Sequence, residues 1–216
     1  MKTIAHRERA GRSLLGALLP WWFIRIFGMG IAALLMIFTL ASPHAFAQGF
    51  LLVAKPLMID PNFERTVVLA VGSEDGRTVG FVLNRPLNRS LAQILPRNPV
   101  LSKFTEPLFN GGPLEPEGLF ALYRGAKPKG TAVAASEKLH LAMDPATVET
   151  LMTEPQAAVR FYNGYAGWGP GQLQNEIDRG GWWRLDLDEE IIFRKDTSKL
   201  WHDLEQRTKR MTARSE

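Results

Sequence analysis

The pattern of apolar positions along the chain predicts a body built mainly from short strands. A continuous apolar run at residues 50–54 is typical of a buried strand. Two β-branched runs, 66–71 and 78–83, flank the pair Asp75-Gly76, which favours tight hairpin turns, so they are predicted to pair as an antiparallel hairpin. The same criteria predict further strands at residues 118–123, 131–135, 158–162, 182–187 and 191–193.

Helix signals are fewer than strand signals. Capping side chains indicate helix starts at Ser90 before residues 91–95, at Asp144-Pro145 before 146–152, and at Thr197 or Ser198 before 199–210. The regular alternation of strands and helices that builds a doubly wound parallel sheet is missing. We therefore predict an α+β fold: a single domain with a curved mixed or antiparallel sheet, barrel-like, and a few packed helices.

A glycine-rich stretch at residues 164–171 is the most distinctive segment of the body. Its four glycines, at 164, 167, 169 and 171, are predicted to form a loop, after which Pro170 favours a first helical turn. Leu173 and Ile177 would give that helix an apolar stripe, and the glycines at 180 and 181 would end it. Such a loop can hold an anion at a helix N-terminus, or it can be an ordinary strand-to-helix connection.

The first 47 residues have the pattern of an export signal. A basic region is followed by residues 26–41, which carry no charge, and then by Ala45 and Ala47 in an Ala-x-Ala cleavage pattern. We expect a cleaved signal peptide at 1–47 and a domain at 48–216. The basic region is long and the apolar core is intermediate in length, so a retained inner-membrane anchor is the alternative. If the first residue of the chain is wrongly assigned, the body would stay in the cytoplasm. With a cleaved signal or a retained anchor, a periplasmic body is expected.

Charge and composition narrow the function classes. The leader holds five basic groups and one acidic group, and removing these from totals of 26 and 22 leaves 21 of each in the body. A neutral body gives no electrostatic reason to expect a nucleic-acid partner. The chain has no cysteine, and the body has only His140 and His202, so disulfides and thiol catalysis are excluded and a metal site is not expected. No nucleotide-binding motif occurs, and no cofactor is indicated.

Polar and glycine residues beside predicted turns form the candidate ligand-binding set. Its members are Asp60, Asn62, Asn84, Arg85, Asn110, Gly111, Gly112, Gly167, Trp168, Gly169, Gln172 and Glu176, with Arg65 beside them. Gly111 and Gly112 could offer adjacent N–H donors, and Glu176 could serve as a general base if it is buried near the loop. Each residue also has a plain structural reading.

These readings are specific to each residue. Aspartate and asparagine are common in turns, so Asp60, Asn62 and Asn110 could each be turn-forming residues. Arg65 could form a solvated pair with Glu64, and Arg85 a surface salt bridge. Trp168, placed between glycines, could stack on a ligand or plug the core.

Five motifs in a fixed order resemble the YqgE/AlgH family of bacterial proteins. The motifs are Phe50-Leu-Leu-Val-Ala-Lys-Pro56, Asp60-Pro-Asn-Phe63 with Arg65-Thr-Val-Val68, Gly80-Phe-Val-Leu-Asn-Arg-Pro86, Asn110-Gly-Gly-Pro113, and Gly164-Tyr-Ala-Gly-Trp-Gly-Pro-Gly-Gln-Leu173 with Glu176-Ile177. The resemblance implies a bent sheet forming a barrel-like body, and its members are often labelled transcriptional regulators. This chain departs from the family pattern at Phe109 and Leu114 and in its leader.

Three functional hypotheses follow. In the first, the body is an exported non-catalytic module in which the turns at 84–86, 110–113 and 164–171 form a cleft for a small-molecule or protein partner. In the second, it is a hydrolase that uses Glu176 or Asp60 as base, with glycine-loop amides holding an oxyanion. In the third, it is the regulator that the family label suggests, which would require a cytoplasmic body with a basic face. Contact with the inner membrane is expected only through residues 1–47.

Overall fold

A computed structural model describes residues 49–94, 96–126, 132–154 and 158–214. The strands are β1 (Phe50–Ala54), β2 (Val67–Gly72), β3 (Thr78–Val82), β4 (Pro86–Ser90), β5 (Pro107–Asn110), β6 (Leu114–Arg124), β7 (Ala132–Ala134), β8 (Leu139–Ala142), β9 (Ala158–Trp168) and β10 (Trp182–Asp186). The helices are α2 (Leu91–Ile94), the 3-10 turn η1 (Leu101–Lys103), α3 (Pro145–Thr153), α4 (Gln172–Asp178), α5 (Glu189–Ile192) and α6 (Leu200–Thr212).

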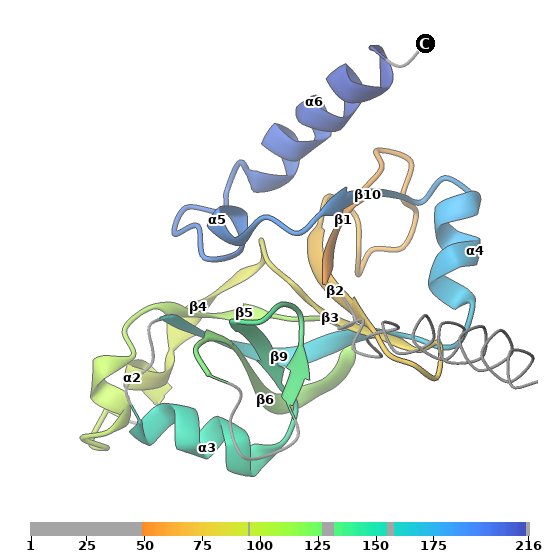
Figure 1. Cartoon of the computed structure of the whole chain (residues 1–216). Coiled ribbons are helices and arrows are strands. Elements are labelled where there is room, and N and C mark those ends of the chain that lie inside the picture. Colours follow the sequence, from red (N-terminus) through yellow and green to blue (C-terminus); the bar gives the residue numbers. More distant parts are fainter. Residues whose placement is uncertain (1–48, 95, 127–131, 155–157, 215–216) are drawn as a thin grey trace, which may run out of the picture. The chain divides into compact units, whose positions relative to one another are not determined.

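The ten strands of the described residues form one curled sheet (Figure 1). Its main path runs β10-β1-β2-β3-β9-β6-β8-β7, and every neighbouring pair on that path is antiparallel. Strand β5 joins the sheet by pairing parallel with β9 and antiparallel with β4. The predicted α+β class, with one domain and a curved mixed sheet, is confirmed.

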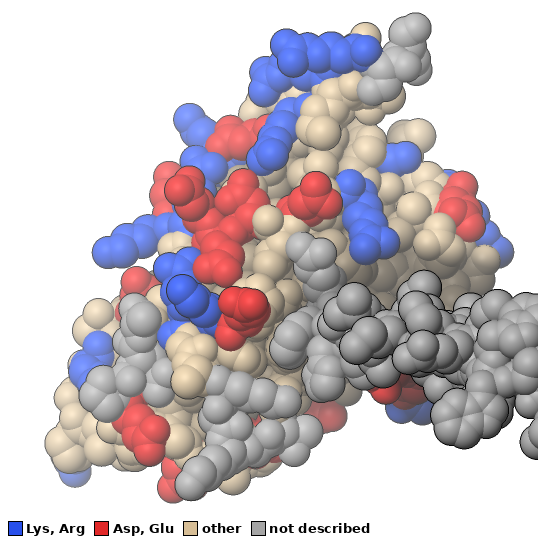
Figure 2. Space-filling model, in the orientation of Figure 1, with Lys and Arg blue, Asp and Glu red and all other residues tan. Residues whose placement is uncertain are grey.

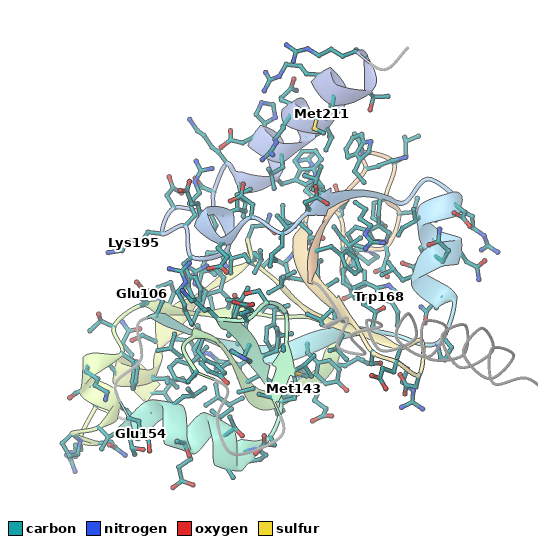
Figure 3. The ribbon with its side chains drawn as sticks, viewed as in Figure 1. Glu106, Met143, Glu154, Trp168, Lys195 and Met211 are labelled. Atoms are coloured by element: carbon teal, nitrogen blue, oxygen red, sulfur yellow. The ribbon has the colours of Figure 1, made fainter. Side chains whose placement is uncertain are left out.

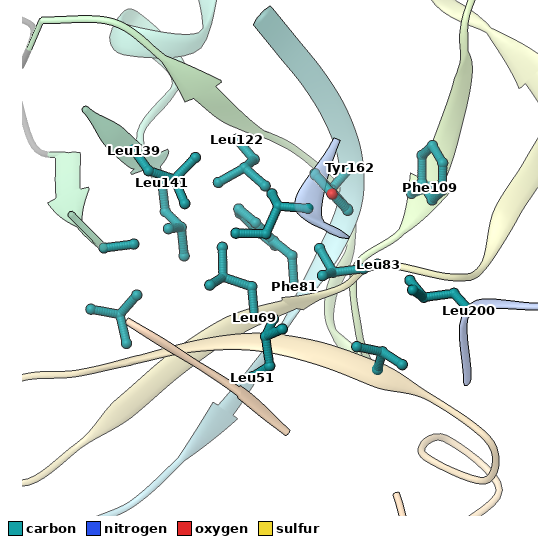
Figure 4. Packing of buried hydrophobic residues seen from close by; sticks show 14 of the residues in the cluster. Leu51, Leu69, Phe81, Leu83, Phe109, Leu122, Leu139, Leu141, Tyr162 and Leu200 are labelled. Atoms are coloured by element: carbon teal, nitrogen blue, oxygen red, sulfur yellow. The ribbon is translucent and has the colours of Figure 1, made fainter. Parts of the chain in front are cut away.

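The strand β1 shows how the sheet is covered on both faces. All five of its residues are buried, and successive side chains of a strand point to opposite faces. Leu51 and Val53 pack into the cluster on the concave side, which Figure 4 shows around Phe81 and Tyr162. Phe50, Leu52 and Ala54 pack instead into a second cluster, under α4. The continuous apolar run therefore serves two cores.

The predicted hairpin is confirmed as β2 and β3. The strands pair from Val68↔Val82 to Gly72↔Thr78. Gly76 turns the chain at a φ of 79°, a left-handed conformation that costs glycine little, and Ser73 N–H donates to Arg77 C=O across the turn.

Two of the predicted helix starts are confirmed by their caps. The Ser90 Oγ accepts from Gln93 N–H at 3.3 Å, and the Gln93 Oε1 accepts from Ser90 N–H at 2.9 Å, a reciprocal capping box. The Asp144 carboxylate accepts from Thr147 N–H at the start of α3. The third start was placed wrongly, because α6 has Lys199 at its N-cap position and no side-chain cap.

Several element predictions were wrong. Residues 164–168 are not a loop but the second half of β9. Residues 191–193 are not a strand, because Asp188 accepts from Glu190 N–H and starts the short helix α5. Strands β4, β5 and β8 were not predicted at all. Residue 95, the first residue of the predicted strand 131–135 and the whole leader lie outside the described residues.

Candidate functional site

The carboxylate of Glu176 lies at the centre of a compact polar and aromatic group. Helix α4 carries it to the buried edges of two indole rings, and its Oε2 accepts from the Nε1 atoms of both Trp168 and Trp182 at 3.0 Å. Its Oε1 accepts from Gln172 Nε2 at 3.1 Å, one turn earlier on the same helix. Three donors thus hold both carboxylate oxygens in place.

Aromatic packing sets the position of the two indoles. Phe63 lies between them, stacked on Trp168 at a centroid distance of 5.7 Å and edge-on to Trp182 at 5.4 Å. The exposed fractions of Trp168 and Trp182 are 4% and 1%. Figure 3 shows Trp168 on the side of the sheet near α4. Of its two predicted roles, the structure places Trp168 in the core rather than on an open stacking surface.

A hollow of about 400 Å³ lies beside this group. Its walls come from the segment after β1 and from the end of α4, and the lining residues are Leu57, Met58, Ile59, Asp60, Phe63, Glu176, Arg179, Gly180 and Gly181. Its size and mainly apolar walls with a few charged groups match the usual character of ligand-binding sites. The candidates Asp60 and Glu176, 116 positions apart in the numbering, meet here.

Two large aliphatic side chains stand in solvent at the mouth of the hollow. Leu57 has an exposed fraction of 90% and Ile59 one of 96%, the highest among the exposed large hydrophobic residues of the described chain. Burying a leucine or isoleucine side chain contributes roughly 1.5–3 kcal/mol. A fold that leaves both of them outside its cores forgoes that stabilisation at this one site.

The turn that follows these side chains in the chain is held by Arg85. Its guanidinium donates to the carbonyls of Pro61, Asn62 and Glu64 at 3.0, 2.7 and 3.2 Å. The predicted surface salt bridge is therefore wrong: Arg85 binds main-chain oxygens of the turn. Partial burial lowers the pKa of Arg85, while the charges of Asp60 and Glu64 act in the opposite direction.

Asn84 fixes the other end of the same turn. Its Oδ1 accepts from Val67 N–H and its Nδ2 donates to Arg65 C=O, both at 2.9 Å. This bond holds Arg65 at a φ of 54°, a conformation that non-glycine residues seldom adopt. The side chain of Arg65 pairs with Glu64 at 3.7 Å, as predicted, and both are exposed. Asp60 acts as a turn former, accepting from Asn62 N–H.

The three predicted turns do lie together, but their meeting point is a packed chain crossing. Asn110 N–H donates to Arg85 C=O, and Gly111 N–H donates to Asn163 C=O. A Cβ added to Gly111 would lie 2.3 Å from the Gly164 oxygen, and one added to Gly112 would lie 2.3 Å from Tyr165. These glycines permit the close approach of backbones and leave no space for a ligand.

The N–H groups expected to face a ligand are used inside the chain. Gly111 donates to β9, and Gly112 donates to the Oδ1 of Asn110 at 3.1 Å. Gly169 N–H donates to Gln172 Oε1 at 3.1 Å, and a Cβ on Gly167 would press on Leu114. The adjacent free donors predicted at Gly111 and Gly112 are therefore not present.

Sequence reasoning missed the apolar half of the hollow. Leu57, Met58 and Ile59 follow Pro56 and precede Asp60-Pro61, so three aliphatic residues occupy a segment bounded by prolines and turn formers. An apolar run in a turn is the signal that would have found them. Trp182 was assigned only to a strand, because its contact with Glu176 depends on the fold.

The remaining chemistry of the described chain is sparse. No group of three or more His, Cys, Asp or Glu side chains within the described ranges is arranged to hold a metal ion. In the same part of the chain, no helix is both long and apolar enough to cross a membrane. Figure 2 shows acidic and basic side chains intermixed over one face, with basic ones gathered at the far end of α6.

Comparison with known proteins places these features in context. A family model described as AlgH-like matches residues 51–212. A UPF0301 protein of Chlorobaculum tepidum is 30% identical over 156 residues, which cover 71% of this chain and 82% of that protein. A UPF0301 protein of Anaeromyxobacter dehalogenans is 33% identical over 171 residues, covering 74% and 86%.

Solved structures show the same fold. The solution structure of the AlgH protein from Pseudomonas aeruginosa matches with a TM-score of 0.60 at 26% identity, covering 74% of this chain and 87% of that one. A crystal structure of a Corynebacterium diphtheriae protein matches with a TM-score of 0.56 at 22% identity, covering 74% and 86%.

Proposed function

The chain belongs to the AlgH-like family, and we propose that its body is a non-catalytic binding module that captures a protein partner at the hollow beside Glu176. One observation carries this proposal: Leu57 and Ile59 project into solvent beside the hollow, from the segment between β1 and the 60–66 turn that Arg85 and Asn84 hold. A segment tethered at both ends loses less conformational entropy than a free one when a partner covers it.

The contact chemistry favours an apolar protein surface. Covering Leu57 and Ile59 together would contribute about 3–6 kcal/mol, and each 1.4 kcal/mol changes a dissociation constant about tenfold. The neighbouring hollow would accept a further apolar side chain against Met58 and Phe63. Asp60 and Arg179 at the same site offer one charge of each sign, which would orient the partner.

The surroundings of Glu176 support binding over catalysis. A general base needs a lone pair directed at substrate, whereas this carboxylate already accepts from two indoles and one amide. No contact of Asp60 activates it as a base either, since its carboxylate caps the turn at Asn62. The hydrolase alternative therefore lacks a specific supporting observation, and so does the regulator alternative.

A site-specific photo-crosslinker tests the proposal in the native host. Placed at Ile59, it should give a discrete adduct with a second protein, while the same group at Glu74 in the exposed β2–β3 turn should give none. Adding Leu57→Ser should abolish the Ile59 adduct without unfolding the body. The absence of any adduct at 59 in folded protein, or identical adducts at both positions, would rule out this surface as the binding site.

We propose further that residues 1–47 direct the body out of the cytoplasm. The support is the order of a basic region, the uncharged run 26–41 and the Ala45-x-Ala47 pattern. Fractionation of the native host followed by intact-mass measurement tests it. A periplasmic chain starting at Gln48 fits a cleaved signal, and a full-length membrane-bound chain fits an anchor. A soluble cytoplasmic chain lacking the leader would contradict both.

A further inference from the structure

The strand β10 ends the main path of the sheet and leaves one side open. It pairs only with β1 among the described strands, from Phe50↔Asp186 to Ala54↔Trp182. Lys55 N–H donates to Gly181 C=O at the end of the same ladder. The main-chain N–H and C=O groups of successive strand residues point to alternate sides of the strand. Those of Trp183 and Leu185 therefore form hydrogen bonds with β1, and those of Arg184 and Asp186 point away from β1.

The outward backbone groups have no partner within the described residues. No hydrogen bond in that part of the chain reaches the main-chain N–H or C=O of Arg184 or Asp186. Both residues are exposed, and neither side chain forms an ion pair there. Unpaired N–H and C=O groups at strand spacing are complementary to another extended strand.

We propose that the open side of β10 pairs antiparallel with β10 of a second copy of this chain, about a twofold axis at Leu185. In this register Arg184 of each copy lies opposite Asp186 of the other, on the same face of the joined sheet. The two outward residues form hydrogen-bonded pairs, so the same contact supplies four main-chain bonds and two charge pairs. None of the three residues at this contact, Arg184, Leu185 and Asp186, lines the hollow, and the proposed dimer does not depend on the proposed partner binding.

The charges select this register over its neighbours. A twofold axis at Arg184 would place two arginines directly opposite each other, which destabilises a strand pair. An axis at Leu187 would place Asp186 opposite Asp188, again like charges. Among the axes from Arg184 to Leu187, only the one at Leu185 pairs opposite charges twice without also placing like charges opposite each other. The Arg184 guanidinium is already positioned, since it lies 4.0 Å from the centroid of the Phe50 ring.

The absence of cysteine from the sequence allows a direct test of the register. In the proposed dimer, Leu185 faces its own counterpart in a non-hydrogen-bonded pair, with Cα atoms about 4.5 Å apart. That separation suits a disulfide. Full-length Leu185→Cys should therefore form a covalent dimer on mild oxidation. Leu187→Cys is the matched control: its counterparts would lie about 13 Å apart, too far to bridge.

Charge exchange supplies an independent readout. Within Leu185→Cys, either Arg184→Asp or Asp186→Arg alone should lower the rate of covalent dimer formation about tenfold, because like charges then meet at both contacts. Mixing the two variants should restore it, since each new charge meets its opposite. Circular dichroism confirms that every variant is folded.

Four results would overturn the proposal. One is a folded Leu185→Cys chain that gives no covalent dimer. The second is equal cross-linking from positions 185 and 187. The third is cross-linking that ignores the charge variants and their mixture. Sedimentation of the unmodified chain gives a measurement free of substitutions, and a strictly monomeric chain at all accessible concentrations would also exclude the dimer.

Discussion

At the scale of single residues, Glu176 shows how a candidate base can be occupied by structure. It accepts from Trp168, Trp182 and Gln172, and thereby ties α4 to the aromatic group. Hydrogen bonds to a charged acceptor contribute more than neutral ones, about 1.5–3 kcal/mol each. Glu176, the sequence's main candidate for a general base, therefore has a structural role: it connects helix α4 to the buried tryptophans.

We predict that Glu176→Gln lowers the free energy of unfolding by about 1–3 kcal/mol, because the charge-assisted bonds are lost and an N–H group must turn toward an existing donor. Asp178→Asn on the same helix is the control, since Asp178 is exposed, and it should change stability by less than about 0.5 kcal/mol. Urea unfolding followed by tryptophan emission measures both. If the two variants lost equal free energy of unfolding, the hydrogen bonds from the two indoles to Glu176 would contribute nothing to stability.

Tyr162 provides a residue-scale prediction about pH. Burial raises the pKa of Tyr162 from 10.0 to about 12. In the unfolded chain the phenol ionises near pH 10, while the folded chain keeps its proton until about pH 12, so unfolding releases a proton between these values. Stability contributed by the neutral phenol is therefore full below pH 10 and is lost as the pH rises toward 12, by up to about 3 kcal/mol.

Tyr162→Phe isolates this effect. The hydroxyl makes no hydrogen bond of normal geometry within the described residues, although the nearby Arg160 guanidinium favours its ionised form, so its removal should leave stability at pH 7 nearly unchanged. Between pH 10 and 12 the variant should lose less stability than the parent chain. Guanidinium unfolding at both pH values measures the difference, and parallel pH profiles would contradict a buried neutral phenol.

At the scale of elements, the chain crossing between β5 and β9 depends on glycine. A Cβ at Gly111 would lie 2.3 Å from a backbone oxygen, a clash that only a backbone shift can relieve. We predict that Gly111→Ala destabilises the body by more than about 3 kcal/mol. Gly72→Ala, where an added Cβ meets nothing within 4 Å, should stay within about 0.5 kcal/mol of the parent. Thermal unfolding of the two variants measures the difference. Both substitutions reduce the entropy of the unfolded chain, but only Gly111→Ala adds a steric clash in the folded state.

The same crossing marks what the sequence could predict and what it could not. Local signals sufficed for the β2–β3 turn at Asp75-Gly76 and for the helix capped by Asp144. They failed at Gly164 and Gly167, glycines typical of a loop that lie inside β9: the backbone of residues 112–116 passes against Gly164, and the Leu114 side chain fills the space beside Gly167. Strand β8 was missed because it is defined by its pairing with β6, which lies earlier in the chain, and the local sequence pattern does not indicate that pairing.

The candidate site divides in the same way. Asp60 and Glu176 were identified because each is an acidic residue beside a predicted turn. Both line the hollow. Asn84 and Arg85 were identified for the same reason but act on main-chain groups of the 60–66 turn. Leu57 and Ile59 were missed because an exposed aliphatic residue can be recognised only when the fold shows that nothing covers it.

At the scale of the whole molecule, the described body contains its own cores. Within the described residues, the three clusters of buried residues draw on positions from Phe50 to Leu204. We predict that a chain beginning at Gln48 folds and unfolds in one cooperative transition with the midpoint of the full-length protein. Calorimetry of both forms checks this. A separate or shifted transition in the full-length chain would show that the leader contributes to the stability of the body.

The position of β9 in the sheet has a consequence for synthesis. This strand joins β3 and β5 to β6, so neither half of the sheet is complete before residue 168 has been made. The outermost strand β10, which covers β1, follows later still. Such distant pairings cannot form before both strands exist, and synthesis at roughly 5–20 residues per second takes many seconds to reach residue 168. A nascent chain would leave the ribosome without a finished sheet, so any machinery acting on its first residues would handle an unfolded polypeptide rather than a globule.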